Sequence, residues 1–536
     1  MQQVSGVGEA EQLTGGQALA GQLVAEGVEV VFGLPGDQLM AALDAFVDAP
    51  ELRYVVTRHE QATTYMADGY ARTSGRPGVA MVVPGVGVYN AATGLATAYA
   101  CSSPVLLLAG QVNRAGIGKD LGLLHDVHDQ LEIVRPITKW ARRITDAGDV
   151  AAGVAEAFTR MTSGRPRPVE VEIPPETFAE KTTAGVTAPV RVPRQAAADT
   201  QVAAAAALLR TASAPVIVAG GGVVLGDASA ALTAVAELLQ APVVTTREGK
   251  GAIDDRHPLS VGTAWVNPRM RPVLGVADVV LAVGTRGAGL GLQENQQLIH
   301  VDVDAAQIGR NHPAAVAVAG DAALTLEALA GQLRRRDDRT AEIRAMRATA
   351  ERELAAVGPQ WEMVQALRRG IPEDGILVCD TTSVAYMCHM GYPVYAPRTY
   401  LSTSYMGTLG FGYPASLGVK VAAPDRPVVT VTGDGGFLFA SNELATAVQH
   451  GIHTVTVVFD DGAYGNSNRD QRDRFGGREY GTVLRNPDWV ALARAFGADG
   501  MVVRDLAHLP GALTEALATE ASTVIAVPMD RLPSPF

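Results

Sequence analysis

Short apolar runs alternate with amphipathic, helix-like segments along most of the chain. In the first third of the sequence, the apolar runs fall at residues 28–32, 54–57, 78–83, 105–109 and 169–173. Continuous apolar runs of about four to eight residues are typical of strands that are buried on both faces of a parallel sheet. The helical stretches between them would supply the crossovers that parallel pairing requires. The pattern therefore predicts repeated βα units.

The same alternation continues to the C-terminus. Further apolar runs lie at residues 215–219, 243–245, 279–283, 298–303, 376–379, 428–432, 454–459 and 523–527. Residues 181–198 are rich in Thr, Ala, Pro and Val without periodicity and predict a linker, and residues 334–353 form a charged, helix-prone connector. We predict an α/β protein with three doubly wound parallel-sheet domains, at residues 12–180, 199–335 and 357–536.

Composition narrows the class of protein. The 536 residues are 47% hydrophobic and 19% charged, which is typical of a folded globular chain, and the net charge is −12. A chain without a basic balance is a poor candidate for binding nucleic acid or an anionic membrane as its main partner. We see no secretory signal and no apolar run of about 20 residues, so a cytoplasmic enzyme is the expectation. The three cysteines are expected to be buried, unpaired side chains.

Acidic residues follow two strands of the third domain at a spacing of one βαβ unit. The strand at 428–432 runs into Gly433, Asp434, Gly435 and Gly436, and the strand at 454–459 ends in Asp460 and Asp461. Because βαβ crossovers are right-handed, both strand ends should open on one edge of the sheet.

This arrangement indicates a metal–diphosphate site. Glycines allow the backbone to approach phosphate oxygens, and carboxylates beside a diphosphate require a hard cation between them. We predict Asp434 and Asp461 as Mg²⁺ ligands, with the carbonyl of Ala463 as a third. Taken alone, residues 433–436 would be interpreted as a tight turn, and Asp460 and Asp461 as a solvated strand end.

The region from 428 to 465 resembles the thiamine-diphosphate enzyme superfamily, whose signature is Gly-Asp-Gly followed after some two dozen residues by an Asn pair. Here Asp460 and Asp461 replace that pair. Aspartate is nearly isosteric with asparagine and is a better ligand for a hard cation, so the metal role is retained. The added charge should tighten Mg²⁺ and slightly disfavour the bare diphosphate.

A second resemblance concerns a carboxylate in the first domain. Arg58, His59 and Glu60, with residues 66–72 behind them, look like the pyrimidine-binding domain of the acetolactate synthase group. Without this resemblance, Glu60 would be interpreted as an acid favoured by a helix dipole. The resemblance implies that Glu60 lies in a dry site, hydrogen-bonds the aminopyrimidine ring and stabilises its imino tautomer, which then deprotonates the thiazolium carbon.

The resemblance covers nearly the whole chain and implies an architecture of pyrimidine-binding, middle and diphosphate-binding domains. It implies a homodimer or homotetramer whose active sites lie at subunit interfaces. It assigns cofactor contacts to Gly36, Glu60, Asn90, Thr382, Ser383, Gly407, Leu409, Gly433, Asp434, Gly435, Gly436, Asp461 and Gly465. Leu409 stands where the family has a bulky aliphatic residue that braces the bent cofactor.

The expected substrate positions depart from the acetolactate synthases. His125 and Asp126 stand in place of a Phe-Gln pair. Residues 465–470, which end at Asp470, contain no aromatic residue where the family has a Trp shortly after the Asn pair. Asp37 matches an acid that helps protonation in simple 2-oxo acid decarboxylases, although their tandem His pair is missing. His125 and His128 could partly substitute for that pair. Gly220, Gly221 and Gly222 leave FAD open as a further cofactor, because a glycine run alone is a weak signal.

These residues lead to one main hypothesis and several alternatives. The main one is decarboxylation of a pyruvate-like 2-oxo acid followed by carboligation to a second carbonyl, with Glu60, Asp37 and His125 as catalytic residues. The alternative is a non-oxidative decarboxylase or 2-hydroxyketone lyase. A flavin-dependent oxidase and a catalytically silent paralogue are further alternatives, and the second would be expected to lack Glu60 or Asp434.

Overall fold

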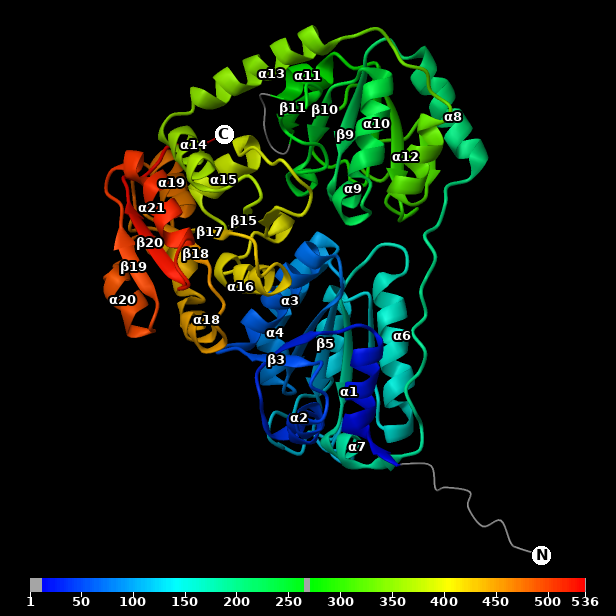
Figure 1. Ribbon diagram of the computed structural model, residues 1–536, viewed down its shortest axis with the longest axis vertical. Helices are drawn as coiled ribbons and strands as arrows, with labels where there is room; N and C mark the ends of the chain where they lie inside the picture. The colour runs from blue at the N-terminus through cyan, green and yellow to red at the C-terminus, as the bar shows by residue number, and fades with distance from the viewer. Residues whose placement is uncertain (1–11, 265–269, 536) are drawn as a thin grey trace, which may run out of the picture. The chain divides into compact units, whose positions relative to one another are not determined.

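The computed structural model describes residues 12–264 and 270–535, which form two compact units. One unit holds residues up to 71 together with 76–192, and the other holds 72–75 and the chain from 193 onward. Figure 1 shows the first unit in blue to cyan, and the second mainly in green to red. None of the described helices is long and apolar enough to cross a membrane.

The N-terminal unit is built on a parallel six-stranded sheet with the order β3-β2-β4-β5-β7-β6. Its strands are β2 (Val30–Gly33), β3 (Arg53–Val56), β4 (Gly78–Val82), β5 (Val105–Gly110), β6 (Trp140–Arg143) and β7 (Val169–Ile173). The helices are α1 (Gly15–Ala25), α2 (Met40–Val47), α3 (Glu60–Ser74), α4 (Val86–Cys101), α5 (Gln130–Val134), α6 (Val150–Thr162) and α7 (Pro175–Ala179). A short antiparallel pair, β1 (Leu13–Thr14) with β8 (Lys181–Thr182), joins the two ends of this unit.

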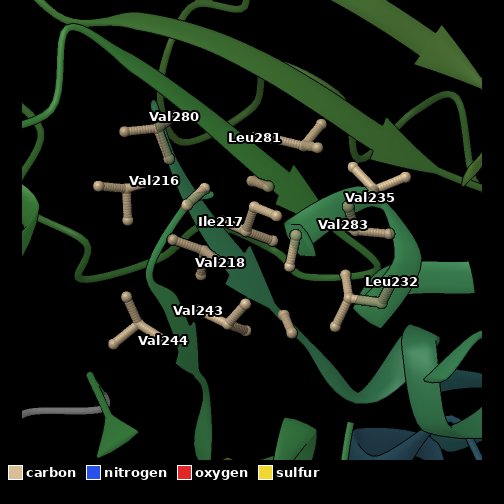
Figure 2. Packing of buried hydrophobic residues seen from close by; sticks show 14 of the residues in the cluster. Val216, Ile217, Val218, Leu232, Val235, Val243, Val244, Val280, Leu281 and Val283 are labelled. Atoms are coloured by element: carbon tan, nitrogen blue, oxygen red, sulfur yellow. The ribbon is translucent and has the colours of Figure 1, made fainter. Parts of the chain in front are cut away.

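The second unit contains two more parallel six-stranded sheets. The first has the order β11-β10-β9-β12-β13-β14. Its strands are β9 (Pro215–Ala219), β10 (Val243–Thr245), β11 (Ser260–Thr263), β12 (Val279–Val283), β13 (Gln297–Asp302) and β14 (Val316–Ala319). Its helices are α8 (Asp199–Thr211), α9 (Gly221–Leu225), α10 (Ser229–Leu239), α11 (Arg271–Gly275), α12 (Ala322–Ala330) and α13 (Thr340–Ala355). Figure 2 shows its core, where Ile217 and Val283 of neighbouring strands lie near Leu232 and Val235 of α10.

The last sheet has the order β16-β15-β17-β18-β20-β19. Its strands are β15 (Ile376–Cys379), β16 (Tyr400–Ser402), β17 (Val428–Gly433), β18 (Val455–Asp460), β19 (Asp499–Val502) and β20 (Thr523–Pro528). Its helices are α14 (Pro359–Gly370), α15 (Ser383–Gly391), α16 (Gly412–Ala422), α17 (Asp434–Leu438), α18 (Leu444–His450), α19 (Gly465–Arg474), α20 (Trp489–Ala495) and α21 (Leu509–Leu517).

The first and last sheets share one topology. When the strands of each sheet are numbered along the chain, both sheets have the order 2-1-3-4-6-5, whereas the sheet between them has the order 3-2-1-4-5-6. All three orders reverse direction near the middle of the sheet, which is the mark of a doubly wound fold. The predicted fold class is therefore confirmed, and the likeness of the first and third domains is one of topology.

The predicted strands and the observed ones differ in a regular way. Every strand inside a sheet had been predicted from its apolar run. In the three six-stranded sheets, the strands without a prediction are β6, β11, β14, β16 and β19, and each of them lies at the edge of its sheet. The two-residue strands β1 and β8 were not predicted either, and β8 falls at the start of the predicted linker. The charged connector contains a helix, α13, as expected. Cys101, Cys379 and Cys388 are buried, as expected, and form no disulfide among the described residues.

Candidate active site

The predicted metal ligands lie at the switch point of the last sheet. β15 and β17 are neighbours there, and the crossovers that follow them run in opposite directions, to β16 and β18. Ligands of open α/β sheets bind at the carboxyl ends of such strands. Gly433 ends β17, and Asp434, which is 2% exposed, begins α17. Asp460 ends the adjacent β18, so both acidic strand ends open on one edge.

Two glycines at this edge are required by close packing. A Cβ atom on Gly435 would lie 2.7 Å from Cε1 of Tyr464, and one on Gly465 would lie 2.6 Å from Oδ2 of Asp461. Both distances are shorter than van der Waals contact, so any larger residue would displace its neighbour. Gly465 therefore leaves the space that the Asp461 carboxylate occupies.

The two aspartates of the acidic pair have different surroundings. Asp460 accepts hydrogen bonds from Asn486 Nδ2 (2.7 Å), Trp489 Nε1 (2.7 Å) and the Gly462 N–H (3.1 Å). Asp461 accepts one at 3.2 Å from the N–H of Ala463, two residues further on. Asp460 is thus engaged by the protein through both carboxylate oxygens, and Asp461 is the member of the pair that can still bind a cation.

The backbone around Ala463 leaves its carbonyl available. Ala463 forms an antiparallel bridge with Val483, and the two hydrogen bonds of this bridge use the groups on either side of it. Tyr464 N–H donates to the Thr482 carbonyl, and Leu484 N–H donates to the Gly462 carbonyl, both at 2.8 Å. The Ala463 carbonyl accepts no hydrogen bond from the described residues, so it fits the predicted third ligand.

Burial and mutual repulsion shift the titration of these carboxyls. Burial, with smaller contributions from the charges of Asp461 and Asp460, raises the pKa of Asp434 to about 6, against the opposing hydrogen bond from Asn486. Burial also raises the pKa of Asp461, against the opposing influence of the Ala463 N–H and the Arg531 charge. A bound cation would remove the cost of keeping these carboxylates ionised together.

The remaining predicted contacts of this half surround the same edge. Thr382 precedes α15 and its Oγ1 lies 3.3 Å from the position of a Cβ on Gly433. Ser383 is the buried first residue of α15. Gly407 is exposed with a φ of 60°, a left-handed conformation that favours glycine, and Leu409 is half-buried two residues later.

Sequence analysis missed Asp380, which holds this edge together. Its carboxylate accepts hydrogen bonds from the N–H groups of Thr381 (2.6 Å) and Gly412 (2.9 Å), and so links the end of β15 to the start of α16. Burial raises its pKa to about 6. An acid directly after an apolar strand and before Thr-Thr-Ser was the available signal.

Glu60 lies at the carboxyl end of the first sheet. It is the first residue of α3, which follows β3, and it is 7% exposed, so the expectation of a buried position is confirmed. Asn90 of α4 donates from Nδ2 to Glu60 Oε2 at 2.9 Å. Oε1 accepts no hydrogen bond from the described residues, and it is therefore the oxygen that can share a proton with a ligand.

The other predicted residues of the first domain lie around the turns at this edge. Gly36 is fixed by Val83, whose Cγ1 would lie 2.2 Å from a Cβ on Gly36. Asp37 follows in the turn after β2 and is exposed. His125 has a φ of 66°, and its carbonyl oxygen would lie 2.3 Å from a Cβ on Gly85, the residue before α4. His128 differs from these, because it forms an exposed pair with Asp120 at 3.2 Å.

The structure gives contacts for Gln130, which sequence analysis did not single out, and for Asp126, which it placed at an expected substrate position. Gln130 accepts from the Gly85 N–H (2.9 Å) and donates to the Gly110 carbonyl (3.1 Å) and to Glu172 (2.8 Å), so it ties α4 to the ends of β5 and β7. Both carboxylate oxygens of Asp126 are buried and have no hydrogen-bond partner among the described residues.

The glycine run that left FAD open is used for packing within the protein. A Cβ on Gly220 would lie 2.2 Å from the Gly284 carbonyl oxygen, and one on Gly222 would lie 2.6 Å from Gly284 Cα. The Gly222 N–H donates to the Gly284 carbonyl at 2.9 Å. The close contact between these turns explains the glycines without a dinucleotide.

The residues around Glu60 and those around Asp434 belong to different compact units of the chain. Within the described ranges, no three His, Cys, Asp or Glu side chains are grouped so that they could hold a metal ion by themselves. The predicted site needs only two side-chain ligands, both carboxylates, together with one backbone carbonyl. Phosphate oxygens of the cofactor would complete the coordination.

Comparison with known proteins places this geometry in a family. The N-terminal TPP-binding domain model of thiamine pyrophosphate enzymes matches residues 13–133, the central domain model matches 202–329, and the C-terminal TPP-binding domain model matches 380–527. The chain belongs to the thiamine pyrophosphate enzyme family, and it resembles the acetolactate synthase large subunits within it.

Three relatives illustrate the range of the resemblance. A protein named probable 2-ketoarginine decarboxylase, from Pseudomonas aeruginosa, is 36% identical over 96% of this chain and 93% of its own length. A probable acetolactate synthase large subunit of Methanocaldococcus jannaschii is 34% identical, covering 97% of this chain and 92% of its own. The acetolactate synthase large subunit of Parasynechococcus marenigrum is 33% identical, covering 97% and 88%.

The raised pKa of Asp434 predicts the pH dependence of metal binding. Mg²⁺ binds the ionised carboxylate, so protons compete with it below the pKa of about 6. We expect Mg²⁺ affinity, measured by calorimetry with saturating cofactor, to fall by up to about tenfold per pH unit between pH 6 and 5. Asp434→Asn is the control, because titration of the diphosphate remains while that of residue 434 is removed. Equal pH dependence in the two proteins would contradict the assignment.

Proposed function

We propose that this chain is an Mg²⁺- and thiamine-diphosphate-dependent enzyme that decarboxylates a 2-oxo acid. The observation that carries the proposal concerns the first and last sheets, which have the same strand order. Each sheet has a different group of polar residues at the carboxyl ends of its strands. One edge holds Glu60 with Asn90, and the other holds Asp434, Asp461 and the carbonyl of Ala463.

The residues of the last sheet would hold the metal and the diphosphate. Asp434, Asp461 and the Ala463 carbonyl supply three oxygen ligands, which suit a hard cation that keeps other positions for phosphate. The hydroxyl of Thr382 and the backbone near Gly433 lie close enough together to contact the same phosphate group. The bound cofactor supplies the electron sink that decarboxylation of a 2-oxo acid needs.

Glu60 would control a proton at the other end of the cofactor. Asn90 donates to Oε2, which leaves Oε1 available, and Oε1 would hydrogen-bond a ring nitrogen of the aminopyrimidine when the cofactor is bound. A carboxyl buried at 7% exposure shares its proton without competition from bulk water, and this favours the tautomer that activates the cofactor.

We infer that the reaction ends by protonation and release of an aldehyde. Ionisable Asp37 and His125 lie in turns at the same edge of the first sheet, and either could deliver a proton to the product carbon. The 36%-identical relative is named a decarboxylase. Carboligation, the main hypothesis from sequence, is the second candidate, and it is supported by the relatives named acetolactate synthase.

Asp126 favours a substrate with a positively charged side chain. Its carboxylate oxygens are buried, and no described residue pairs with them. An unpaired buried carboxylate is unfavourable, so a cationic ligand group would relieve that cost. The relative named 2-ketoarginine decarboxylase would act on a 2-oxo acid of this charge type. We propose that Asp126 receives an ammonium or guanidinium group of the substrate.

We further propose a homodimer in which the two halves of each site come from different subunits. Both edges expose apolar side chains, with Val86 and Tyr89 of α4 at 44% and 54%, and Leu438 and Phe439 beside α17 at 41% and 51%. Such groups on a cofactor-binding edge are suited to burial against a second copy of the chain.

Replacement of Glu60 by Gln is expected to separate binding from turnover. The amide keeps the size of the side chain but cannot share a proton, so cofactor binding should persist while turnover falls by about 10²- to 10⁴-fold. The measurement is cofactor titration together with product analysis on pyruvate and on cationic 2-oxo acids. Aldehyde as the product supports the proposal, acetolactate supports the second candidate, and full activity of Glu60→Gln would refute the role of Glu60.

Replacement of Asp126 by Asn should lower kcat/KM for a guanidino 2-oxo acid by about 10- to 100-fold, because a charge-assisted hydrogen bond is lost. For a neutral 2-oxo acid of similar length, the value should change by less than about threefold. A parallel loss for both substrates would show that Asp126 supports the fold and does not select charge.

Mixed dimers are expected to restore activity from two inactive chains. Glu60→Gln and Asp434→Ala damage different halves of the site, so random pairing should recover about a quarter of the wild-type activity. Asp434→Ala with Asp461→Ala is the control, since both changes damage one half. If the first mixture were as inactive as the control, the shared site would be ruled out.

A further inference from the structure

Asn486 lies between α19 and α20 and bridges two carboxylates. Its Nδ2 donates to Asp434 Oδ2 at 2.6 Å and to Asp460 Oδ1 at 2.7 Å, while its own Oδ1 is buried without a hydrogen-bond partner among the described residues. The two carboxylates on one side determine the orientation of the amide, because only the N–H groups can face them both. A neutral donor thus separates two like charges.

The hydrogen bonds of Asp460 explain why its carboxylate is occupied by the protein and is not a cation ligand. Its Oδ1 receives Asn486 and the Gly462 N–H, and its Oδ2 receives the indole N–H of Trp489 at 2.7 Å. Every group around it is a donor, so the position requires an acceptor-only side chain. An asparagine at 460 would turn its own amide N–H groups toward one of these donors.

The segment that carries Asn486 is fixed on both sides. Leu484, two residues before it, donates its N–H to the Gly462 carbonyl at 2.8 Å, next to the predicted ligand loop. Asp488, two residues after it, caps α20 by accepting from the N–H groups of Val490 and Ala491 at 3.0 Å. The backbone that carries Asn486 is therefore held in place on both sides. This suits a side chain whose role is to orient the carboxylate of another residue.

We propose that Asn486 is a positioning residue for the metal ligand Asp434. It is not itself a ligand. Its hydrogen bond to Oδ2 holds the rotation of the Asp434 carboxylate and presents the other oxygen to the cation, and its contact with Asp460 keeps that carboxylate away from the cation. The proposal rests on the Mg²⁺ and thiamine-diphosphate site of the proposed function.

The test measures Mg²⁺ affinity by calorimetry at saturating thiamine diphosphate, with thermal melting of the metal-free protein as a second readout. Asn486→Leu keeps the approximate volume and removes both N–H groups. We expect Mg²⁺ affinity to fall by about 10- to 100-fold, as for residues that orient metal ligands elsewhere. Asn486→Ala is a second variant, with the same expected loss, should the leucine not fold.

Two further variants locate the effect. Asn442→Leu removes an amide that also donates to a carboxylate, Glu443 Oε1 at 3.3 Å, and it should change Mg²⁺ affinity by less than about threefold. Trp489→Phe removes a donor from Asp460 alone, so it should lower the melting temperature more than it lowers Mg²⁺ affinity.

The outcomes separate this proposal from the proposed function. If wild type shows no Mg²⁺-dependent cofactor binding, both are overturned. If wild type binds Mg²⁺ and both Asn486 variants bind it within about threefold of wild type, only the positioning role is overturned. An equal loss of affinity in Trp489→Phe would also overturn it, because the effect would then act through Asp460.

Discussion

Repulsion between carboxylates is the constraint around which the last sheet is organised. Asp434, Asp460 and Asp461 follow two adjacent parallel strands, so the topology itself brings three acids to one edge. The protein treats them differently. Asp460 accepts hydrogen bonds on both oxygens, whereas burial raises the pKa values of Asp434 and Asp461. A site with this electrostatic imbalance favours a divalent cation over water.

The first and last sheets have the same topology, and each has a different polar group at its carboxyl edge. Both sheets reverse direction between their first and third strands, and in both the turns at that point contain glycines in close contact with neighbouring residues. One edge carries a protein acid whose second oxygen is open, and the other carries oxygens suited to a metal. The middle sheet has a different strand order, and its own switch point is closed by Gly220, Gly222 and Gly284 packed together.

What sequence could predict depended on burial. All residues of a central strand such as β12 are buried, because helices cover both faces of the sheet. Such a strand is an unbroken apolar run and can be predicted from the sequence. Most edge strands lack this signal. Trp140–Arg143 and Asp499–Val502 carry polar and charged side chains because one face or one side is open to solvent. The fold class followed from the central strands, and of the six sheet edges only β3 was predicted from its apolar run.

In the candidate site, residues next to strand ends could be predicted from sequence, and residues that reach the site from distant loops could not. Asp434, Asp461 and Glu60 stand at strand ends, so their spacing in sequence implied their place in space. Asn486 and Trp489 contact the acidic pair from more than 20 residues further along the chain, across a loop whose path no local pattern encodes. Their donors also explain the departure from the Asn pair of the family. At Asp460 an indole N–H and an amide N–H both donate to the carboxylate, so contacts within the protein explain an aspartate at this position. Asp461 accepts the N–H of Ala463 and is the member of the pair that we propose as a metal ligand.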